Sequence, residues 1–276
     1  MTDHVEQLRP LLGKTMVIVA HPDDEALGCA SLLQQMEQAI VVFCTDGAPR
    51  DNYFWREYCV REEYAGVRRR EALAALDHAG VAFVEFLPIA DQELHLNLRT
   101  AFDQLSDAIE RYRPDALLTL AYEGGHPDHD SCSFLGAELG QRFELPVFEM
   151  PLYHRAGGEI TFQAFIAPTT GEMEQVSDGQ MLENKRRVIQ EYVSQKLTTE
   201  DFELSREIFR KQAKYDYSRP AHPGKLNYEA WGWKVKGAEV CANLIAFNEA
   251  IAKKPQRARR AATAAGRSGT RSKRAA

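Results

Sequence analysis

Two short clusters of histidine and carboxylate residues hold the residue types that hydrolytic chemistry requires. They read HPDDE at residues 21–25 and HPDHD at residues 126–130. Imidazole nitrogens and carboxylate oxygens are the donors of a catalytic zinc site, which has three protein ligands and leaves one position open for water. A nearby carboxylate can take a proton from that water, and an imidazole can stabilise the oxyanion of amide hydrolysis. Together the clusters favour a metal-dependent hydrolase.

Apolar runs and helical spacing indicate which elements position these clusters. Short apolar runs rich in β-branched residues predict five buried strands, at residues 16–20, 39–44, 81–87, 116–120 and 147–152. Helical patterns lie between them, at residues 25–38, 61–78, 98–109 and 131–141. This alternation predicts a Rossmann-like, doubly wound α/β sheet that is mostly parallel, with a 3-2-1-4-5 core.

In a sheet of this order the first and fourth strands are neighbours. The two clusters follow these two strands directly or after a short turn. Ligands of such folds bind at the carboxyl ends of the strands, where the strand order reverses. We therefore expect the two clusters to line one pocket, although they lie far apart in the sequence.

His21, Asp24 and His129 can supply the three ligands of one metal ion. A His-Asp-His set suits Zn²⁺ and can also hold Fe²⁺, because the affinity order of divalent metals does not decide which one is used. Each cluster alone also has a structural interpretation. Asp23 or Asp24 can cap a helix, and Glu25 can be a first-turn acid favoured by the helix dipole.

Three further residues are candidates for proton transfer. Asp23, next to a predicted ligand, is the candidate general base. His126, one turn before His129, is placed to stabilise the oxyanion and to protonate the leaving amine. Asp128 or a neighbour can orient that imidazole and keep it protonated.

The segments AHPDDE (residues 20–25) and GHPDH (residues 125–129) resemble the two motifs of the PIG-L/LmbE family of N-acetylglucosaminyl deacetylases. The resemblance extends over about residues 14–200. It implies a Rossmann-like fold, a single zinc ion, and removal of an N-acetyl group from an N-acetylglucosamine-type sugar or glycoconjugate. It also implies the same roles as above, with metal ligands His21, Asp24 and His129, general base Asp23, polarising His126 and its supporting residue Asp128.

Other positions match the family with less specific patterns. Arg68 and Glu71 resemble an Arg-x-x-Glu motif whose arginine contacts substrate hydroxyls or phosphate. Asp91 resembles an acid that lines the sugar pocket. Solvated surface charge is the alternative interpretation for Arg68 and Asp91. Residues 185–195 resemble a late family helix, for which a structural role is expected.

The chain divides into a folded body and a basic tail. With 276 residues, 44% of them hydrophobic, it can form one deacetylase-like domain over residues 1–252, with a core at about 14–153 and a small mixed lobe at 154–252. The lobe is expected to contain a strand at 160–166, helices at 181–193 and 200–214, and an irregular aromatic segment at 215–235 that packs the lobe or shapes acceptor specificity, with packing favoured.

The tail, residues 253–276, has nine Lys or Arg residues and no Asp or Glu. With almost no large apolar residue, it is predicted to be disordered. It has neither aromatic residues for base stacking nor an amphipathic face, so a flexible appendage is favoured over nucleic-acid or membrane binding.

Five cysteines without a CxxC pair favour a reducing compartment. The first residues lack a secretory pattern, and no apolar run reaches the ~20 residues that span a bilayer, so a cytoplasmic protein is expected. The sequence does not indicate the oligomeric state.

Other functions remain open. The same site fits an amidase of a larger N-acyl conjugate or of a lipid-linked glycan. A catalytically silent sugar-binding relative is a further alternative, although the complete set of candidate residues argues against it. For the deacetylase, the expected partner is a small-molecule N-acetyl sugar or glycoconjugate substrate.

Overall fold

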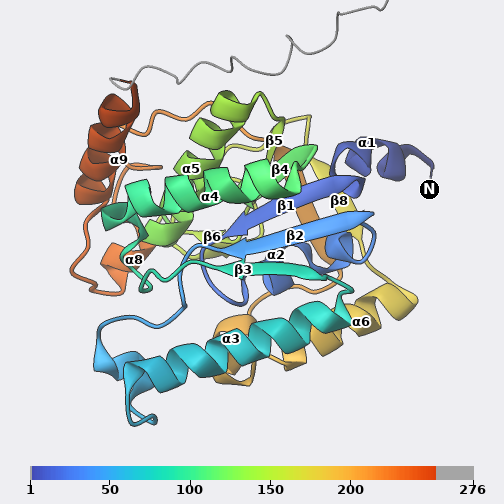
Figure 1. Ribbon diagram of the computed structural model, residues 1–276, viewed down its shortest axis with the longest axis horizontal. Helices are drawn as coiled ribbons and strands as arrows, with labels where there is room; N and C mark the ends of the chain where they lie inside the picture. Colours follow the sequence, from blue (N-terminus) through green and yellow to red (C-terminus); the bar gives the residue numbers. More distant parts are fainter. Residues whose placement is uncertain (1, 253–276) are drawn as a thin grey trace, which may run out of the picture.

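The computed structural model describes residues 2–252 and contains one seven-stranded sheet (Figure 1). The strand order is β3-β2-β1-β4-β5-β9-β8, which confirms the predicted 3-2-1-4-5 core. Five strands are parallel: β1 (Lys14–Val19), β2 (Gln38–Phe43), β3 (Phe83–Phe86), β4 (Ala116–Leu120) and β5 (Val147–Met150). β9 (Arg206–Lys211) pairs antiparallel with β5, and β8 (Met173–Val176) pairs antiparallel with β9.

Helices cover both faces of this sheet (Figure 1). One group of packed helices consists of α2 (Asp24–Leu33), α3 (Arg61–His78) and α6 (Gly179–Gln190). The other group consists of α4 (Leu98–Tyr112), α5 (Pro127–Phe143) and α9 (Gly237–Ala252). Because both faces are covered, the central strands β1, β2 and β4 are almost wholly buried and consist mainly of apolar residues.

Shorter elements complete the fold. They are α1 (Thr2–Leu12), α7 (Lys196–Thr199), α8 (Asn227–Ala230), the hairpin of β6 (Tyr153–His154) and β7 (Thr161–Phe162), and the 3₁₀ turns η1 (Asn52–Trp55), η2 (Leu94–Leu96) and η3 (Val193–Gln195). The strand predicted at 160–166 is thus reduced to two residues. Among residues 2–252, no helix combines the length and the apolar character needed to cross a membrane.

The predicted helix over residues 200–214 is wrong, because this segment contains strand β9. Glu207 and Arg210 in this strand are buried, and each forms an ion pair, Glu207 with Lys185 of α6 and Arg210 with Glu149 of β5. Pairing with two neighbouring strands satisfies the backbone and overrides the local helical tendency. The predicted basic tail lies outside the described residues.

Strand β9 also stabilises the helix that begins in the first cluster. Helix α2 is interrupted at Cys29, whose φ of −151° and ψ of 19° are not helical. The carboxylate of Glu207 accepts hydrogen bonds from the backbone N–H groups of Ser31 (2.7 Å) and Leu32 (3.0 Å), just beyond this break. Buried Lys185 lies 2.8 Å from the same carboxylate and balances its charge. The helix predicted at 25–38 ends at Leu33.

Candidate active site

The two histidine and carboxylate clusters meet at the carboxyl ends of β1 and β4. These strands pair in parallel, so the residues that follow them leave the sheet at the same edge. The ring centroid of His21 lies 4.3 Å from that of His126 and 5.3 Å from that of His129. Helix α5 begins at Pro127, earlier than predicted, and therefore presents the second cluster from its first turn.

Asp24 connects the two histidines that were predicted to bind metal with it. Its Oδ2 accepts hydrogen bonds from the backbone N–H groups of Ala20 (3.0 Å) and His21 (2.7 Å), which fixes the turn after β1. Its Oδ1 lies 3.2 Å from Nε2 of His129, and its Oδ2 lies 3.5 Å from Nδ1 of His21. Although burial alone would raise it, the pKa of Asp24 is held well below its usual range by these imidazoles.

The donor atoms in this cluster fit a metal ion. Nδ1 of His129 is buried without a polar partner, and Nε2 of His129 and Oδ1 of Asp91 form no hydrogen bond although other donor groups of the cluster lie within 3.3 Å. A coordinated cation would satisfy all three atoms. Two donor groups within residues 2–252 have ligand atoms within 4.8 Å of one another: His21, His126 and His129, and His21, Asp91, His126 and Asp128. The nitrogen and oxygen donors suit a divalent transition metal.

Asp23 occupies a strained turn between β1 and α2. Its φ is 138°, which is unusual for a residue other than glycine, and its side chain does not cap the helix. Oδ2 of Asp23 lies 3.2 Å from Nη2 of Arg68. Burial raises the pKa of Asp23 to about 7, although the Arg68 cation opposes the shift. A carboxylate with a pKa near neutrality is suited to general-base catalysis.

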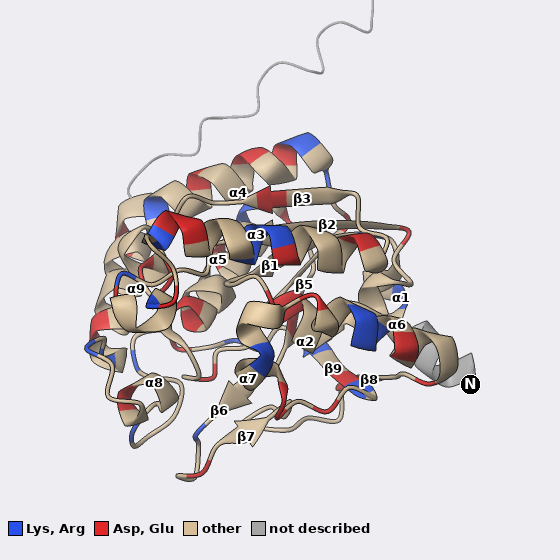
Figure 2. Cartoon of the chain, turned by 90° about the horizontal axis from the view of Figure 1, so that it is seen from below, with Lys and Arg blue, Asp and Glu red and all other residues tan. Residues whose placement is uncertain are grey.

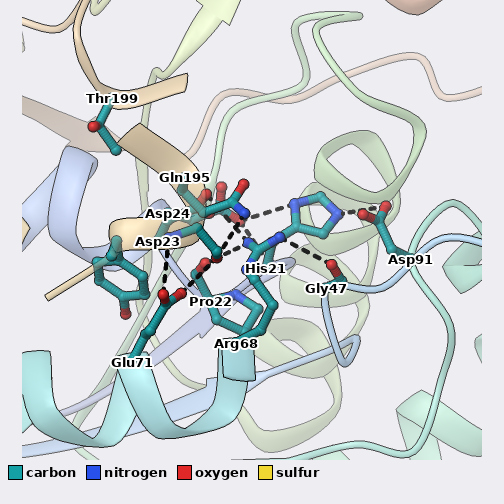
Figure 3. A network of polar contacts seen from close by, with 12 residues as sticks. His21, Pro22, Asp23, Asp24, Gly47, Arg68, Glu71, Asp91, Gln195 and Thr199 are labelled. Atoms are coloured by element: carbon teal, nitrogen blue, oxygen red, sulfur yellow. Dashed lines mark hydrogen bonds and ion pairs between the residues drawn. The ribbon is translucent and has the colours of Figure 1, made fainter. Parts of the chain in front are cut away.

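Arg68 points from α3 toward the turn that contains Asp23 (Figure 3). It donates hydrogen bonds from Nη2 to the carbonyl of Pro22 (2.5 Å) and from Nη1 to the carbonyl of Gly47 (2.9 Å). With only 4% of its surface exposed, it is not the solvated charge of the alternative interpretation. A Cβ atom at Gly47 would lie 3.1 Å from Cζ of Arg68, and φ there is +66°, so this turn requires glycine.

A second layer of contacts supports Arg68 from the segment after α6. Nε2 of Gln195 donates a hydrogen bond to the hydroxyl of Tyr64 (2.8 Å), which in turn accepts from Arg68 (3.4 Å). Glu71 accepts from the backbone N–H (2.8 Å) and the hydroxyl (2.6 Å) of Ser194. The Arg-x-x-Glu motif therefore joins α3 to residues 192–195, the structural role expected for the late helix.

Glu25 and Tyr192 support Asp23 in a way that sequence reasoning missed. Oε2 of Glu25 accepts a hydrogen bond from the backbone N–H of Asp23 (3.2 Å), and Oε1 accepts from the hydroxyl of Tyr192. Glu25 is fully buried, which raises its pKa to about 8. Its position in the first helical turn suggested only a dipole effect, and Tyr192 lies too far away in sequence to reveal the contact.

His126 lies between the two carboxylates Asp91 and Asp128. Its Nε2 is 3.3 Å from Oδ1 of Asp91, and its Nδ1 accepts a hydrogen bond from the backbone N–H of Asp128 (3.1 Å). Burial and the nearby His21 cation lower the pKa of His126 although Asp91 opposes them, the reverse of the expected stabilisation of the protonated form. Asp91 is thus the carboxylate that faces the outer nitrogen of His126.

The side chain of Asp128 supports the loop after β3. Its two oxygens accept hydrogen bonds from the backbone N–H groups of Gln92 (2.6 Å) and Leu94 (3.0 Å), and Oδ2 lies 3.2 Å from Nε2 of His21. The carboxylate is completely buried. Asp128 was expected to orient His126 and keep it protonated. Its backbone N–H contacts Nδ1 of that ring as a donor, whereas its carboxylate positions the loop that carries Asp91.

Comparison with solved structures shows which proteins share this fold. The A40926 pseudoaglycone deacetylase Dbv21 has a TM-score of 0.58 and 16% identity, covering 74% of this chain and 98% of that one. The N,N'-diacetylchitobiose deacetylase of Pyrococcus horikoshii has a TM-score of 0.53 and 22% identity, covering 70% and 74%. The zinc-inhibited form of teicoplanin deacetylase Orf2 has a TM-score of 0.52 and 18% identity, covering 67% and 85%.

These identities establish likeness of fold alone. The 4-carboxy-2-hydroxymuconate hydratase GalB of Pseudomonas putida KT2440 is also similar, with a TM-score of 0.50, 16% identity and coverage of 74% and 97%. The reaction must therefore be argued from the site. No curated protein matches the chain. The family model described as PIG-L, GlcNAc-PI de-N-acetylase, matches residues 16–139, which include both clusters, and the chain therefore contains a PIG-L family domain.

Proposed function

We propose that this protein is a metal-dependent hydrolase that removes the N-acetyl group from an N-acetylglucosamine-type sugar or glycoconjugate. The proposal rests on the convergence of a buried His and Asp donor cluster with Asp23, whose pKa is raised to about 7. Metal ligation without an adjacent base would fit a binding protein equally well. The base and the partnered imidazole of His126 favour catalysis instead.

We assign the metal ligands to His21, Asp24 and His129, and the metal to zinc. Asp24 touches both imidazoles, and His129 has no other hydrogen-bond partner for its ring nitrogens. Nitrogen and oxygen donors of this type are typical of catalytic zinc sites, and Fe²⁺ is the main competitor. When bound, the metal would polarise the substrate carbonyl and lower the pKa of a water molecule.

The residues around the ligands divide the proton transfers between them. Asp23 takes a proton from the attacking water, and Arg68 keeps the carboxylate oriented and favours its ionised form. His126, whose Nδ1 accepts a hydrogen bond from Asp128, carries its proton on Nε2 beside Asp91 and donates a hydrogen bond from there to the developing oxyanion. The proton that Asp23 takes from water is the one that the leaving amine receives, so the two transfers balance. All four side chains are buried, so bulk water competes little with these transfers.

The deciding experiment measures amine release from a panel of N-acetylglucosamine glycosides. Metal-stripped protein would be titrated with Zn²⁺ and separately with Fe²⁺, both from below to above one equivalent, because teicoplanin deacetylase Orf2, which has the same fold, has a zinc-inhibited form. Release that peaks near one equivalent supports the proposal. Stoichiometric metal binding without release from any glycoside contradicts the assigned substrate and favours a larger N-acyl conjugate. Absence of both contradicts the metal site itself.

A further inference from the structure

Five aromatic side chains form a continuous wall beside His126 and His129. The wall consists of Tyr53, Phe54, Tyr153, Trp231 and Trp233. The ring of Trp233 lies 5.0 Å from that of His126, and the ring of Tyr153 lies 5.3 Å from that of His129. Trp231 joins the two, at 5.3 Å from Trp233 and 5.9 Å from Tyr153. The wall therefore begins at the proposed catalytic histidines.

The position of the two tryptophans follows from a short helix fixed against the second cluster. Asn227, the buried first residue of α8, donates hydrogen bonds from its backbone N–H to the carbonyl of Gly124 (2.9 Å) and from Nδ2 to that of Gly125 (3.4 Å). The backbone N–H of Trp231 then bonds to the carbonyl of Asn227 (3.0 Å). Gly232, with a φ of +82°, turns the chain between the two tryptophans, whose ring centroids lie 5.3 Å apart.

The outer part of the wall comes from the segment after β2. Phe54 in η1 lies 6.0 Å from Trp233 and 5.5 Å from Tyr53, measured between ring centroids. Asp51 fixes this turn by accepting a hydrogen bond from the backbone N–H of Tyr53 (3.0 Å). Two segments that are far apart in the sequence thus contribute to one surface.

This surface is too exposed to serve mainly for packing, which was the interpretation favoured from the sequence. Tyr53 is 64% exposed, Trp231 is 48% exposed and Phe54 is 38% exposed. Contiguous exposed aromatic residues next to a reaction site are typical of ligand recognition.

We propose that the wall binds a second sugar ring, linked to the N-acetyl sugar that reacts, so that the substrate contains at least two sugar units. This inference rests on the proposed function and adds the class of the leaving portion. A pyranose has apolar C–H faces and hydroxyl edges. It can therefore stack on ring faces while its edges meet the polar groups that border them.

The borders of the wall favour such a ring over an acyl chain. The guanidinium of Arg56 lies 5.1 Å from the ring centroid of Tyr53, and exposed Lys234 follows Trp233 directly. Exposed Lys236 donates a hydrogen bond from Nζ to the carbonyl of Trp233 (3.4 Å) and keeps further donors for a ligand. An acyl chain would cover these polar groups without offering them a partner, which costs free energy. A sugar hydroxyl can hydrogen-bond to each of them.

The test compares three substrates on the zinc-loaded full chain: N-acetylglucosamine, its β-1,4-linked disaccharide, and its octyl glycoside. We expect the disaccharide to have the highest kcat/KM. In Trp231→Ala, kcat/KM for the disaccharide should fall about three- to tenfold because the stacking of one sugar ring is lost, and the change should appear in KM. For the monosaccharide, kcat/KM should fall less. Phe83→Ala is the matched control, because Phe83 is 39% exposed and lies in β3, outside the wall.

Two outcomes would overturn the inference. The octyl glycoside could be the best substrate and lose most in Trp231→Ala, in which case the wall binds an acyl chain. Alternatively, the monosaccharide and disaccharide could lose equally, which would make the wall structural. Calorimetric dissociation constants for the two sugars decide the matter even if no turnover occurs. Tighter disaccharide binding that weakens in Trp231→Ala supports the wall, and an unchanged value rejects it, whatever amine release says about the proposed function.

Discussion

The guanidinium of Arg68 lies 3.2 Å from the carboxylate of Asp23, and hydrogen bonds to the carbonyls of Pro22 and Gly47 hold it there. This contact opposes the effect of burial, which raises the pKa of Asp23 to about 7. Arg68 therefore determines how much of the proposed base is ionised near neutral pH. It acts as a positioning residue, and a direct contact with substrate is a separate possibility that experiment can distinguish.

Replacing Arg68 by Gln should move the acid limb of the pH profile to higher pH. Without the cation, the ionised form of Asp23 loses its nearest positive charge, so the pKa of Asp23 rises and a higher pH is needed for activity. The loss in kcat/KM should be greater at pH 6 than at pH 9. Arg68→Lys, which keeps the charge, should restore part of the profile. A loss that is equal at all pH values would instead indicate direct substrate binding.

The change Asp23→Asn should separate metal binding from turnover. Asparagine keeps the size of the side chain but cannot accept the proton, so kcat should fall about 100- to 10,000-fold. Bound metal, measured by elemental analysis after gel filtration, should stay at the wild-type ratio. Near-normal kcat in this variant would show that another group is the base.

The two histidines of the second cluster should respond differently to removal. His129→Ala should lower metal affinity by at least about 100-fold, because the metal loses a ligand. Even mutation of a residue that only hydrogen-bonds to a ligand typically lowers metal affinity by about 10- to 100-fold. His126→Ala should retain metal and lose activity. Competition with a fluorescent chelator gives both affinities. Loss of metal in His126→Ala would favour the donor group of His21, His126 and His129 over the assigned one.

The sheet and the convergence of the two clusters could be predicted because both depend on strong local patterns. Apolar runs identified β1 and β4, and the order of a doubly wound sheet makes these strands neighbours. The candidate residues follow the strands closely, so the strand positions determined theirs as well.

The supporting residues could not be predicted in the same way. Acidic and basic residues are interspersed along α3 (Figure 2), and nothing in that pattern distinguishes buried Arg68 from its exposed neighbours Arg69 and Arg70. Glu207 likewise lies within the helix predicted at 200–214, although its carboxylate accepts hydrogen bonds from the backbone of the interrupted α2. In each case the charged side chain is buried because it contacts a residue that is distant in sequence. The local sequence of one segment does not identify that contact.

The buried side chain of Glu123 predicts that the free energy of unfolding depends on pH. Its Oε1 accepts hydrogen bonds from the backbone N–H groups of Leu152 (2.9 Å) and Tyr153 (3.0 Å), while its Oε2 is buried without a partner. Burial raises the pKa of Glu123 well above its usual value of 4.5. The protonated side chain therefore stabilises the fold below pH 4.5, and this contribution is lost as pH rises through the higher pKa of the folded state.

Glu123→Gln should remove this loss, because the amide keeps an oxygen acceptor and never ionises. The free energy of unfolding of the variant, relative to wild type, should therefore increase from pH 5 to pH 8, by at most about 1.4 kcal/mol per pH unit. Urea unfolding at several pH values measures it, with Glu57→Gln at an exposed position as the control. A difference that does not change with pH would mean that Glu123 is ionised in the folded protein. Its two backbone hydrogen bonds to the start of β6 would then be charge-assisted, and they would fix Tyr153 beside His129 more firmly than a neutral acid can.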